Sequence, residues 1–315
     1  MRARILGRTE IPVGEIGFGA WAIGGNAHGN SYGPTDDAVS VAAVQWALDL
    51  GCTFFDTADV YGWGHSEAVL GKALAGHRDG VQIATKVGGD FYHGGVQTNF
   101  DPEYVRFALD RSLERLQTDH VDLYQLHNPP AEMFGDPAAY AILEELQAEN
   151  KVRHFGVSVH APEEALAAIQ VGKPAVIQIP FSLLRQEWID EVLPAAAKHG
   201  VGAVAREPLG NGFLTGKYSG AEAFPPGDIR SHWPRGLLRA RATAADQFSF
   251  LLDGETKTLA QAALRFVLSF EAVSTAIPGI KTPEQAEEDL AAVGGLFTAA
   301  QLKRCRDLFR ENFGR

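Results

Sequence analysis

Four polar side chains, Asp56, Tyr61, Lys86 and His127, have the types that reduction of a carbonyl by hydride requires. Such a reduction needs a proton donor for the developing alkoxide and a group that makes the donation easier. A tyrosine is a poor acid at its free pKa of about 10, but a nearby lysine cation brings that pKa towards neutrality. An aspartate keeps a buried lysine charged, and a neutral histidine can orient the carbonyl. Each role therefore has a candidate here.

Taken singly, these residues have ordinary structural explanations. Asp56 could be a helix cap or an ion-pair partner, and His127 a core histidine with its hydrogen bonds satisfied. Lys86 is harder to explain in this way, because a lysine that directly ends an apolar strand would be buried without a partner. The order and the flanking residues of the set together favour a shared site.

Short apolar runs position these side chains. Each run is rich in β-branched and aromatic residues and is followed by turn or helix-start residues, which is typical of a buried strand. Polar groups at the carboxyl ends of successive parallel strands form the active sites of (β/α)8 barrels. The polar residues that end such runs are Asp56, Lys86, His127, Ser158, Gln178 and Arg206.

The spacing of the remaining elements predicts a single α/β domain over residues 1–315, a (β/α)8 TIM barrel. Residues 4–13 are expected to form an N-terminal β-hairpin and residues 16–20 the first barrel strand, with further strands starting near residues 53, 82, 121, 154, 175, 202 and 272. Helices are expected over 102–116, over 162–169 and over 36–50, the last with Val39, Ala43, Trp46, Ala47 and Leu50 on its apolar face. Residues 207–245, after the seventh strand, read as a long loop over the barrel mouth.

Composition narrows the function classes. The net charge of −11 argues against nucleic acid or an anionic membrane as a partner, because both bind basic surfaces. The apolar runs are too short to cross a bilayer and none follows Met1 as a signal peptide would, so we expect a cytoplasmic protein. A disulfide between Cys52 and Cys305 is not expected, and the ten histidines include no metal-binding cluster.

Several longer motifs resemble the aldo-keto reductase superfamily. They are PhePheAspThrAlaAspValTyrGly (54–62), AlaThrLysValGly (84–88), LeuTyrGlnLeuHisAsn (123–128), GlyValSer (156–158), ValIleGln (176–178), GlyPheLeuThrGlyLysTyr (212–218) and AlaIleProGlyIleLysThrProGluGlnAlaGluGluAsp (276–289). The resemblance implies an NADPH-dependent reductase of an aldehyde or ketone, with Tyr61 as general acid, Lys86 and Asp56 tuning it, and His127 orienting the substrate. The same likeness leaves open an alcohol or sugar dehydrogenase working in the oxidative direction. It also leaves open a cofactor-binding regulatory subunit like the β subunits of potassium channels.

The resemblance also implies a set of cofactor contacts. Asn128, Ser158 and Gln178 would hold the nicotinamide carboxamide, and the planar guanidinium of Arg206 would stack on the ring where many members have an aromatic residue. The other implied cofactor residues are Gly212, Leu214, Gly216, Lys217, Gly279, Lys281, Gln285, Glu288 and Asp289.

One position departs from the family pattern, which commonly continues Gly-Val-Ser with Asn where this chain has Val159. The resemblance then implies that the carboxamide is held by fewer contacts or by a neighbour such as His160. On this basis Val159→Asn should leave the fold unchanged and tighten cofactor binding by at most about 1 kcal/mol, the value of one net hydrogen bond.

A helix start near the end of the chain favours NADP(H). Thr282 as N-cap, Pro283 at the first position and Gln285 completing a capping box predict a helix whose N-terminus suits an anion, and Lys281 adds a full charge. This feature resembles the family's site for the 2′-phosphate. Asp289 stands where the family more often has Asn, and a carboxylate there would repel a phosphate.

Substrate identity depends on loops near residues 21–34, 88–98 and 207–240, whose shapes the sequence does not give. Trp21 and Trp63 are candidates for the pocket wall or for ordinary core. Arg230, Arg235, Arg239 and Arg241 could attract an anionic substrate, clamp the cofactor or be solvated. Residues 17–22 match a dinucleotide fingerprint by chance, because the glycines and proline that follow exclude the helix that this fingerprint requires.

Overall fold

The computed structural model describes residues 2–28, 31–292 and 295–314. Eight parallel strands form one sheet in the order β12-β11-β10-β9-β8-β5-β4-β3. Bridges from Ile16 to Ala276 and from Gly19 to Gly279 join its two edges and close the barrel. The barrel strands are β3 (Phe18–Gly19), β4 (Phe54–Asp56), β5 (Gln82–Val87), β8 (Val121–His127), β9 (Val152–Ser158), β10 (Val176–Pro180), β11 (Gly202–Arg206) and β12 (Val273–Ile277).

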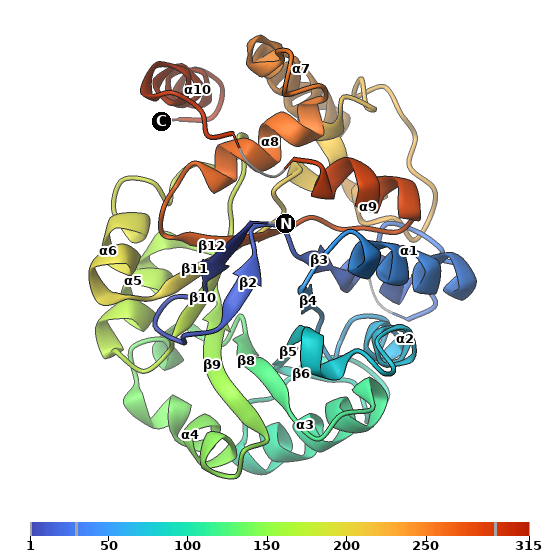
Figure 1. The fold of residues 1–315 in the computed structure, drawn as a ribbon, viewed down its shortest axis with the longest axis vertical. Coiled ribbons are helices and arrows are strands. Elements are labelled where there is room, and N and C mark those ends of the chain that lie inside the picture. Colours follow the sequence, from blue (N-terminus) through green and yellow to red (C-terminus); the bar gives the residue numbers. More distant parts are fainter. Residues whose placement is uncertain (1, 29–30, 293–294, 315) are drawn as a thin grey trace.

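Helices surround these strands (Figure 1). They are α1 (Asp37–Asp49), α2 (His65–Ala73), α3 (Pro102–Leu116), α4 (Ala141–Ala148), α5 (Pro162–Val171), α6 (Val192–His199), α7 (Arg235–Asp246), α8 (Leu259–Leu268), α9 (Pro283–Leu290) and α10 (Ala299–Asn312). Shorter 3-10 turns cover Ala20–Gly24, Arg78–Gly80, Ala131–Met133, Pro137–Tyr140, Gly210–Thr215, Ile229–His232 and Gln247–Leu251. The expected (β/α)8 barrel is therefore confirmed. Residues 17–22 lead from β3 into the 3-10 turn Ala20–Gly24, and the long helix that follows a dinucleotide-binding glycine motif is not formed there.

The predicted hairpin is present as β1 (Ala3–Ile5) paired antiparallel with β2 (Pro12–Gly14). Leu6 and Val13 of this hairpin are fully buried against side chains inside the barrel, among them Phe54 and Leu123. Arg4 donates to the carbonyl oxygens of Leu268 and Val273, which lie before and at the start of β12. The hairpin thus closes the end of the barrel where the strands begin. The opposite end, where they finish, is left for the site.

Helix boundaries follow from local capping. Asp36 accepts a hydrogen bond from the Val39 amide at the start of α1, and Asp101 accepts one from the Glu103 amide at the start of α3. The C-cap of α3 is Gln117, which has a φ of 56°. The predicted apolar face of α1 is partly wrong. Val39 and Trp46 are exposed, whereas Ser40, Ala43, Val44 and Ala47 are buried. The buried stripe is rotated from the predicted one, because α1 packs between α2 and α9.

The segment after β11 also differs from the sequence expectation. Residues 207–234 are irregular with two 3-10 turns, but residues 235–246 of the predicted loop form α7. Leu238, Ala242 and Ala245 recur at helical spacing and are buried, whereas Arg235 and Arg239 point into solvent. The arginines and Gly236 obscured this short apolar stripe in the sequence.

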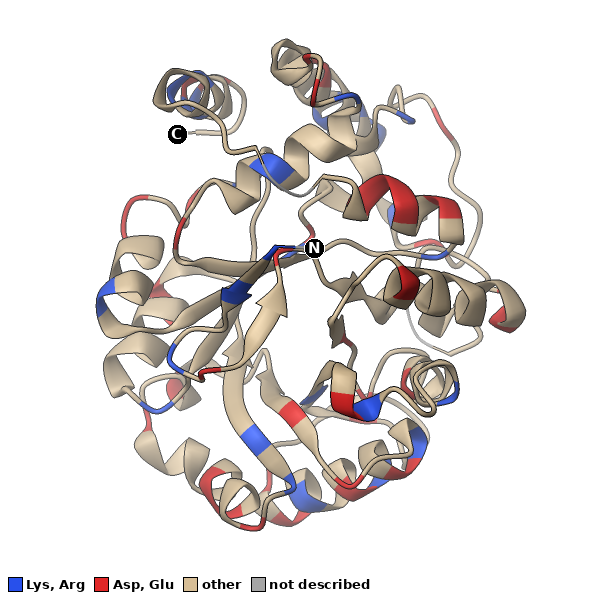
Figure 2. Cartoon of the chain, in the orientation of Figure 1, with Lys and Arg blue, Asp and Glu red and all other residues tan. Residues whose placement is uncertain are grey.

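The charged residues lie mainly on the helices and loops around the barrel (Figure 2). Cys52 and Cys305 are both buried free thiols. Within residues 2–28, 31–292 and 295–314, no group of three or more His, Cys, Asp or Glu side chains is arranged to hold a metal. In the same part of the chain, no helix has the length and apolar character to span a membrane.

The loop after β5 contains a short antiparallel pair, β6 (Gly89–Asp90) with β7 (Gln97–Thr98).

Candidate active site

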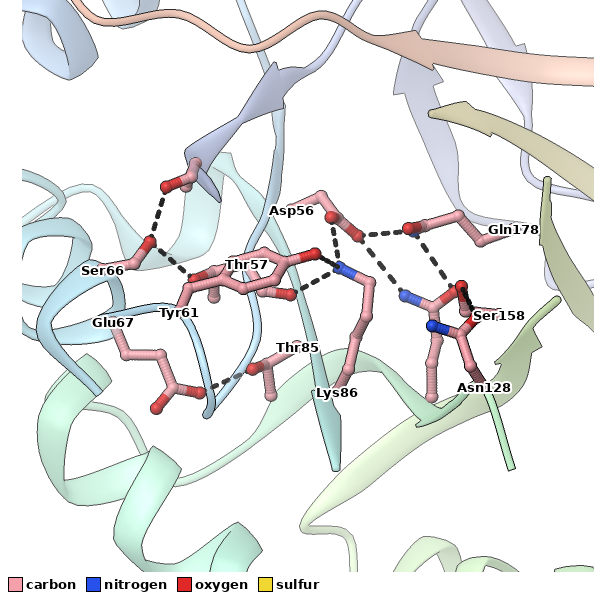
Figure 3. A network of polar contacts seen from close by, with 12 residues as sticks. Asp56, Thr57, Tyr61, Ser66, Glu67, Thr85, Lys86, Asn128, Ser158 and Gln178 are labelled. Atoms are coloured by element: carbon pink, nitrogen blue, oxygen red, sulfur yellow. Dashed lines mark hydrogen bonds and ion pairs between the residues drawn. The ribbon is translucent and has the colours of Figure 1, made fainter. Parts of the chain in front are cut away.

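Lys86 connects two of the predicted catalytic residues, Asp56 and Tyr61 (Figure 3). Its Nζ is fully buried and donates to Asp56 Oδ1 at 2.5 Å and to the Thr57 carbonyl oxygen at 2.7 Å. It also donates to the Tyr61 hydroxyl at 3.4 Å. The Tyr61 and His127 rings meet edge to face, with centroids 5.7 Å apart. The structure therefore brings all four residues together.

The segment that carries Tyr61 is held tightly behind β4. Thr57 and Ser66 share a hydrogen bond of 2.8 Å between their hydroxyls, and the Ser66 hydroxyl donates to the Ala20 carbonyl oxygen at 2.8 Å. Gly62 has a φ of 61°, and a Cβ there would lie 2.2 Å from the Gly24 carbonyl oxygen. Only glycine allows this close approach, so the Tyr-Gly pair of the motif fixes where the phenol lies.

Burial and charge set the protonation states at the site. Burial raises the pKa of Tyr61, and the Lys86 cation opposes this rise without reversing it. The expectation that the lysine brings the tyrosine pKa towards neutrality is therefore wrong, because in this enclosed site burial has the larger effect. Burial disfavours the Lys86 ammonium, but the nearby Asp56 carboxylate and Tyr61 outweigh it, and the pKa of Lys86 is raised. Burial, together with the Lys86 and Arg206 charges, lowers the pKa of His127 well below its usual value. The phenol is protonated, the lysine charged and the imidazole neutral at neutral pH.

A cavity of about 270 Å³ opens over these groups. Tyr61, His127 and Gln178 line its floor, and Trp21, Tyr32 and Ile229 provide apolar wall. Trp63 is not among its lining residues. It stacks between His28, at 4.8 Å, and Phe91, at 6.0 Å, outside the cavity. Of the two tryptophans proposed for the pocket, the structure thus places only Trp21 in it.

A second cavity of about 210 Å³ adjoins the first and shares Tyr32, Glu207, Asn211 and Gly279 with it. Together they make one trough from the catalytic residues to the start of α9. Seven of the implied cofactor residues line the second cavity: Gly212, Lys217, Gly279, Lys281, Gln285, Glu288 and Asp289. Leu214 is instead fully buried in the core, and Gly216 lines neither cavity.

The residues implied for the nicotinamide end lie on adjacent strands. Ser158 Oγ donates to Asn128 Oδ1 at 3.0 Å, and Gln178 Nε2 donates to Asp56 Oδ2 at 2.8 Å. Gln178 Oε1 is buried and has no hydrogen-bond partner within the described residues. Arg206 lines the cavity beside them. Its guanidinium pairs with Glu207 and donates to the Val159 carbonyl oxygen at 3.1 Å.

Val159 does not face this site. Its side chain is fully buried in the apolar cluster between the barrel and its helices, as is that of Val157, while Ser158 between them bonds towards Asn128. Successive residues of an extended chain point to opposite sides, so position 159 points away from the mouth. His160, the suggested substitute, is exposed and its Nδ1 lies 2.9 Å from Arg206 Nη2.

The sequence-based expectation for Val159→Asn is therefore reversed. We now expect this substitution to bury an amide among apolar side chains and to lower the free energy of unfolding by about 1–3 kcal/mol, with little effect on cofactor affinity. Urea denaturation and cofactor titration of the purified variant would measure both. Unchanged stability with tighter cofactor binding would show that the side chain at this position reaches the site after all.

Sequence reasoning named Arg230 but missed its pairing with Asp228 and the contacts that join the loops over the trough. Arg230 is buried and makes a two-point ion pair with Asp228, at 2.9 and 2.7 Å, and its guanidinium lies over the Tyr32 and Phe224 rings. The Tyr32 hydroxyl accepts from Asn211 Nδ2 at 3.1 Å. Arg230 therefore anchors the loop, and it also lines the second cavity. The Asp-x-Arg spacing was the one sequence signal for this pair. Gly29 and Asn30 of the predicted substrate loop lie outside the described residues.

Comparison with known proteins places this arrangement in context. Residues 15–310 match the Aldo/keto reductase family. The chain is 33% identical to "Aldo-keto reductase YhdN" of Bacillus subtilis, over 89% of this chain and 85% of that protein. It is 29% identical to the "NADH-specific methylglyoxal reductase" of Escherichia coli, over 91% and 92%. The solved glycerol dehydrogenase AKR11B4 from Gluconobacter oxydans superposes with a TM-score of 0.84 at 31% identity, covering 99% of this chain and 96% of that one.

Proposed function

Because the chain belongs to the aldo/keto reductase family and is an NAD(P)H-dependent oxidoreductase of carbonyl groups, we propose that Tyr61 supplies the proton and that NADPH is the preferred cofactor. The observation that carries the first part is the buried Lys86 Nζ, which contacts Asp56, the Thr57 carbonyl oxygen and the Tyr61 hydroxyl together. The Lys86 ammonium has three N–H groups, and the Tyr61 hydroxyl is the partner of the third, so a full positive charge lies beside the phenol.

The roles follow from the charges. The Tyr61 hydroxyl donates its proton to the substrate oxygen as negative charge develops there, and the Lys86 ammonium stabilises the phenolate that remains. Asp56 keeps Lys86 charged in a buried position. Neutral His127 lines the same cavity and orients the carbonyl by hydrogen bonding.

The trough also fits a nicotinamide dinucleotide. When bound, the reduced nicotinamide supplies the hydride. The unpartnered Gln178 Oε1, buried where Gln178 lines the cavity, suits a carboxamide N–H, and the Ser158–Asn128 pair lies at the same level of the barrel. The planar Arg206 guanidinium would lie against the ring, and the residues around Lys281 would hold the adenosine end.

Two features support NADPH over NADH. Thr282 and the first turn of α9 adjoin the second cavity, and Lys281 stands immediately before this helix N-terminus. Pro283 has no N–H and the Gln285 N–H bonds to Thr282 Oγ1, so the Glu284 N–H is the backbone donor that the first turn can offer an anion. Burial raises the pKa of Asp289 to about 8, which keeps this side chain mostly protonated at neutral pH and removes the expected repulsion of a phosphate. The Escherichia coli relative is named for NADH, so the preference must be decided on the residues of this chain.

We expect Lys281→Ala to raise the KM for NADPH about tenfold or more, the value of a charge-assisted hydrogen bond, and to leave the KM for NADH within about twofold. Steady-state kinetics with both cofactors would measure this. Lys281 Nζ also donates to the Tyr32 and Pro34 carbonyl oxygens, at 3.0 and 3.1 Å, so a loss of loop order could mimic the effect. Lys281→Gln is the matched control, because its amide can still donate to these carbonyls but carries no charge. Equal losses with both cofactors would contradict a phosphate contact.

The activity itself is tested by following NADPH and NADH absorbance with a panel of methylglyoxal, aryl aldehydes and aldoses, and with glycerol and NADP+ for the reverse direction. We expect turnover of at least one class, faster with NADPH. If the purified protein turns over nothing in either direction but still binds cofactor, a regulatory role would replace the proposed one.

A further inference from the structure

Gln125 is a buried polar residue of the barrel interior that the proposed chemistry does not use. It is fully buried on β8, in direct register with Lys86 on β5. Its Nε2 donates to Asp56 Oδ2 at 3.4 Å, and its Oε1 accepts from Gln178 Nε2 at 3.5 Å. Within the described part of the chain, the Gln125 side chain makes these two hydrogen bonds. Both partners, Asp56 and Gln178, belong to the candidate active site.

The interior of the barrel has room for the contact between Gln125 and Gln178, although a strand lies between theirs. Gln125 lies on β8 and Gln178 on β10, with β9 between them. The β9 residue in register with Gln125 is Gly156, where a Cβ would lie 2.6 Å from the Val176 carbonyl oxygen. With no side chain at this level of β9, the two glutamine amides can meet inside the barrel.

The side chains of Asp56, Gln125 and Gln178 are joined by hydrogen bonds that take both N–H groups of the Gln178 amide. An amide NH2 has two protons, and those of Gln178 go to Asp56 Oδ2, at 2.8 Å, and to Gln125 Oε1. What remains of Gln178 is Oε1, which is buried and has no partner among the described residues. A buried acceptor without a hydrogen-bond partner costs free energy, so this oxygen is suited to accept a hydrogen bond from a ligand.

We propose that Gln125 is a positioning residue that, with Asp56, fixes the Gln178 amide so that it offers the cofactor an acceptor and no donor. This inference rests on the proposed function, in which the carboxamide lies against Gln178. Gln178 then hydrogen-bonds to the NH2 group of the carboxamide and not to its carbonyl oxygen. Gln125 acts through Gln178 and touches neither substrate nor cofactor.

The test compares NADP+ with its 3-acetylpyridine analogue, in which a methyl group replaces the carboxamide NH2. Dissociation constants are measured by fluorescence quenching for the parent, Gln178→Leu and Gln125→Leu. We expect the parent to bind NADP+ about fivefold more tightly than the analogue, the equivalent of one net hydrogen bond. In Gln178→Leu the ratio should fall to about one. In Gln125→Leu it should fall to about two, because the Gln178 amide is then held by Asp56 alone and can pivot about that bond, which moves Oε1 out of line with the carboxamide.

A control separates this role from simple loss of a buried amide. Gln186 is also buried and donates to the Leu183 and Cys305 carbonyl oxygens, away from the trough. Gln186→Leu should lower the thermal midpoint about as much as Gln125→Leu but keep the parent ratio.

If Gln125→Leu keeps the parent ratio while Gln178→Leu loses it, the inference is overturned and the proposed function stands. If Gln178→Leu keeps it too, Gln178 does not hold the carboxamide, and that part of the proposed function fails with the inference.

Discussion

Tyr61→Phe is expected to reduce kcat for carbonyl reduction by about 10²- to 10⁴-fold, the usual contribution of a general acid, while the dissociation constant for NADPH changes by less than about twofold. The substitution removes one oxygen atom and leaves the ring against His127 and Trp21 in place. The phenol acts only when charge develops on the substrate oxygen, so cofactor binding should not depend on it. Steady-state kinetics and cofactor titration would measure the two effects separately.

Tyr32→Phe is the matched control for this experiment. Tyr32 also lines the cavity, but its hydroxyl bonds to Asn211 and not to Lys86. It should lose activity by no more than about tenfold, the upper range for one net hydrogen bond. If Tyr61→Phe kept activity within about threefold of the parent, another group would have to be the proton donor.

Lys86→Met should be comparably damaging to catalysis and, in contrast to Tyr61→Phe, should destabilise the fold. It leaves Asp56 buried without its counter-charge, and breaking a buried ion pair costs about 3–5 kcal/mol. The Lys86 cation opposes the raised pKa of Tyr61, so its removal raises this pKa further. Reduction needs the protonated phenol, and the alkaline limb of the residual activity should therefore move to higher pH. Urea denaturation and a pH profile of kcat would check both effects.

The double variant Asp56→Asn with Lys86→Met separates stability from catalysis. It removes both buried charges, so most of the lost stability should return. Activity should not return, because nothing then stabilises the phenolate. Recovery of activity together with stability would show that the lysine serves the fold alone.

Most of the polar residues of the candidate site were predictable because they lie at or near strand ends, and Tyr61 follows soon after β4. A run of buried β-branched and aromatic residues that stops at a polar one identifies both the strand and the end at which it finishes, and parallel strands in a barrel bring these ends together. A local capping signal likewise identified the start of the helix at Thr282. These features depend on a few neighbouring residues and needed no tertiary contacts.

Directions and pairings were decided by the tertiary structure. Val159 and Trp63 lie beside site residues in the chain but point elsewhere, because each side chain follows the local backbone and the surface it packs on. Arg230 became an anchor through its pairing with Asp228 and its packing on Tyr32, nearly 200 residues away in the sequence. From the sequence, Gln125 is one more residue of a buried strand; the register of β5, β8, β9 and β10 sets it near Asp56 and Gln178.

Electrostatics shows the same division. The sequence by itself determined that a lysine, an aspartate and a tyrosine would meet, and hence the sign of each pairwise interaction. It did not determine the direction in which the Tyr61 pKa moves, because that depends on how completely Trp21 and the other residues around the cavity enclose the ring. Pairwise charge effects follow from residue types, whereas desolvation depends on the surface that the folded chain removes from water.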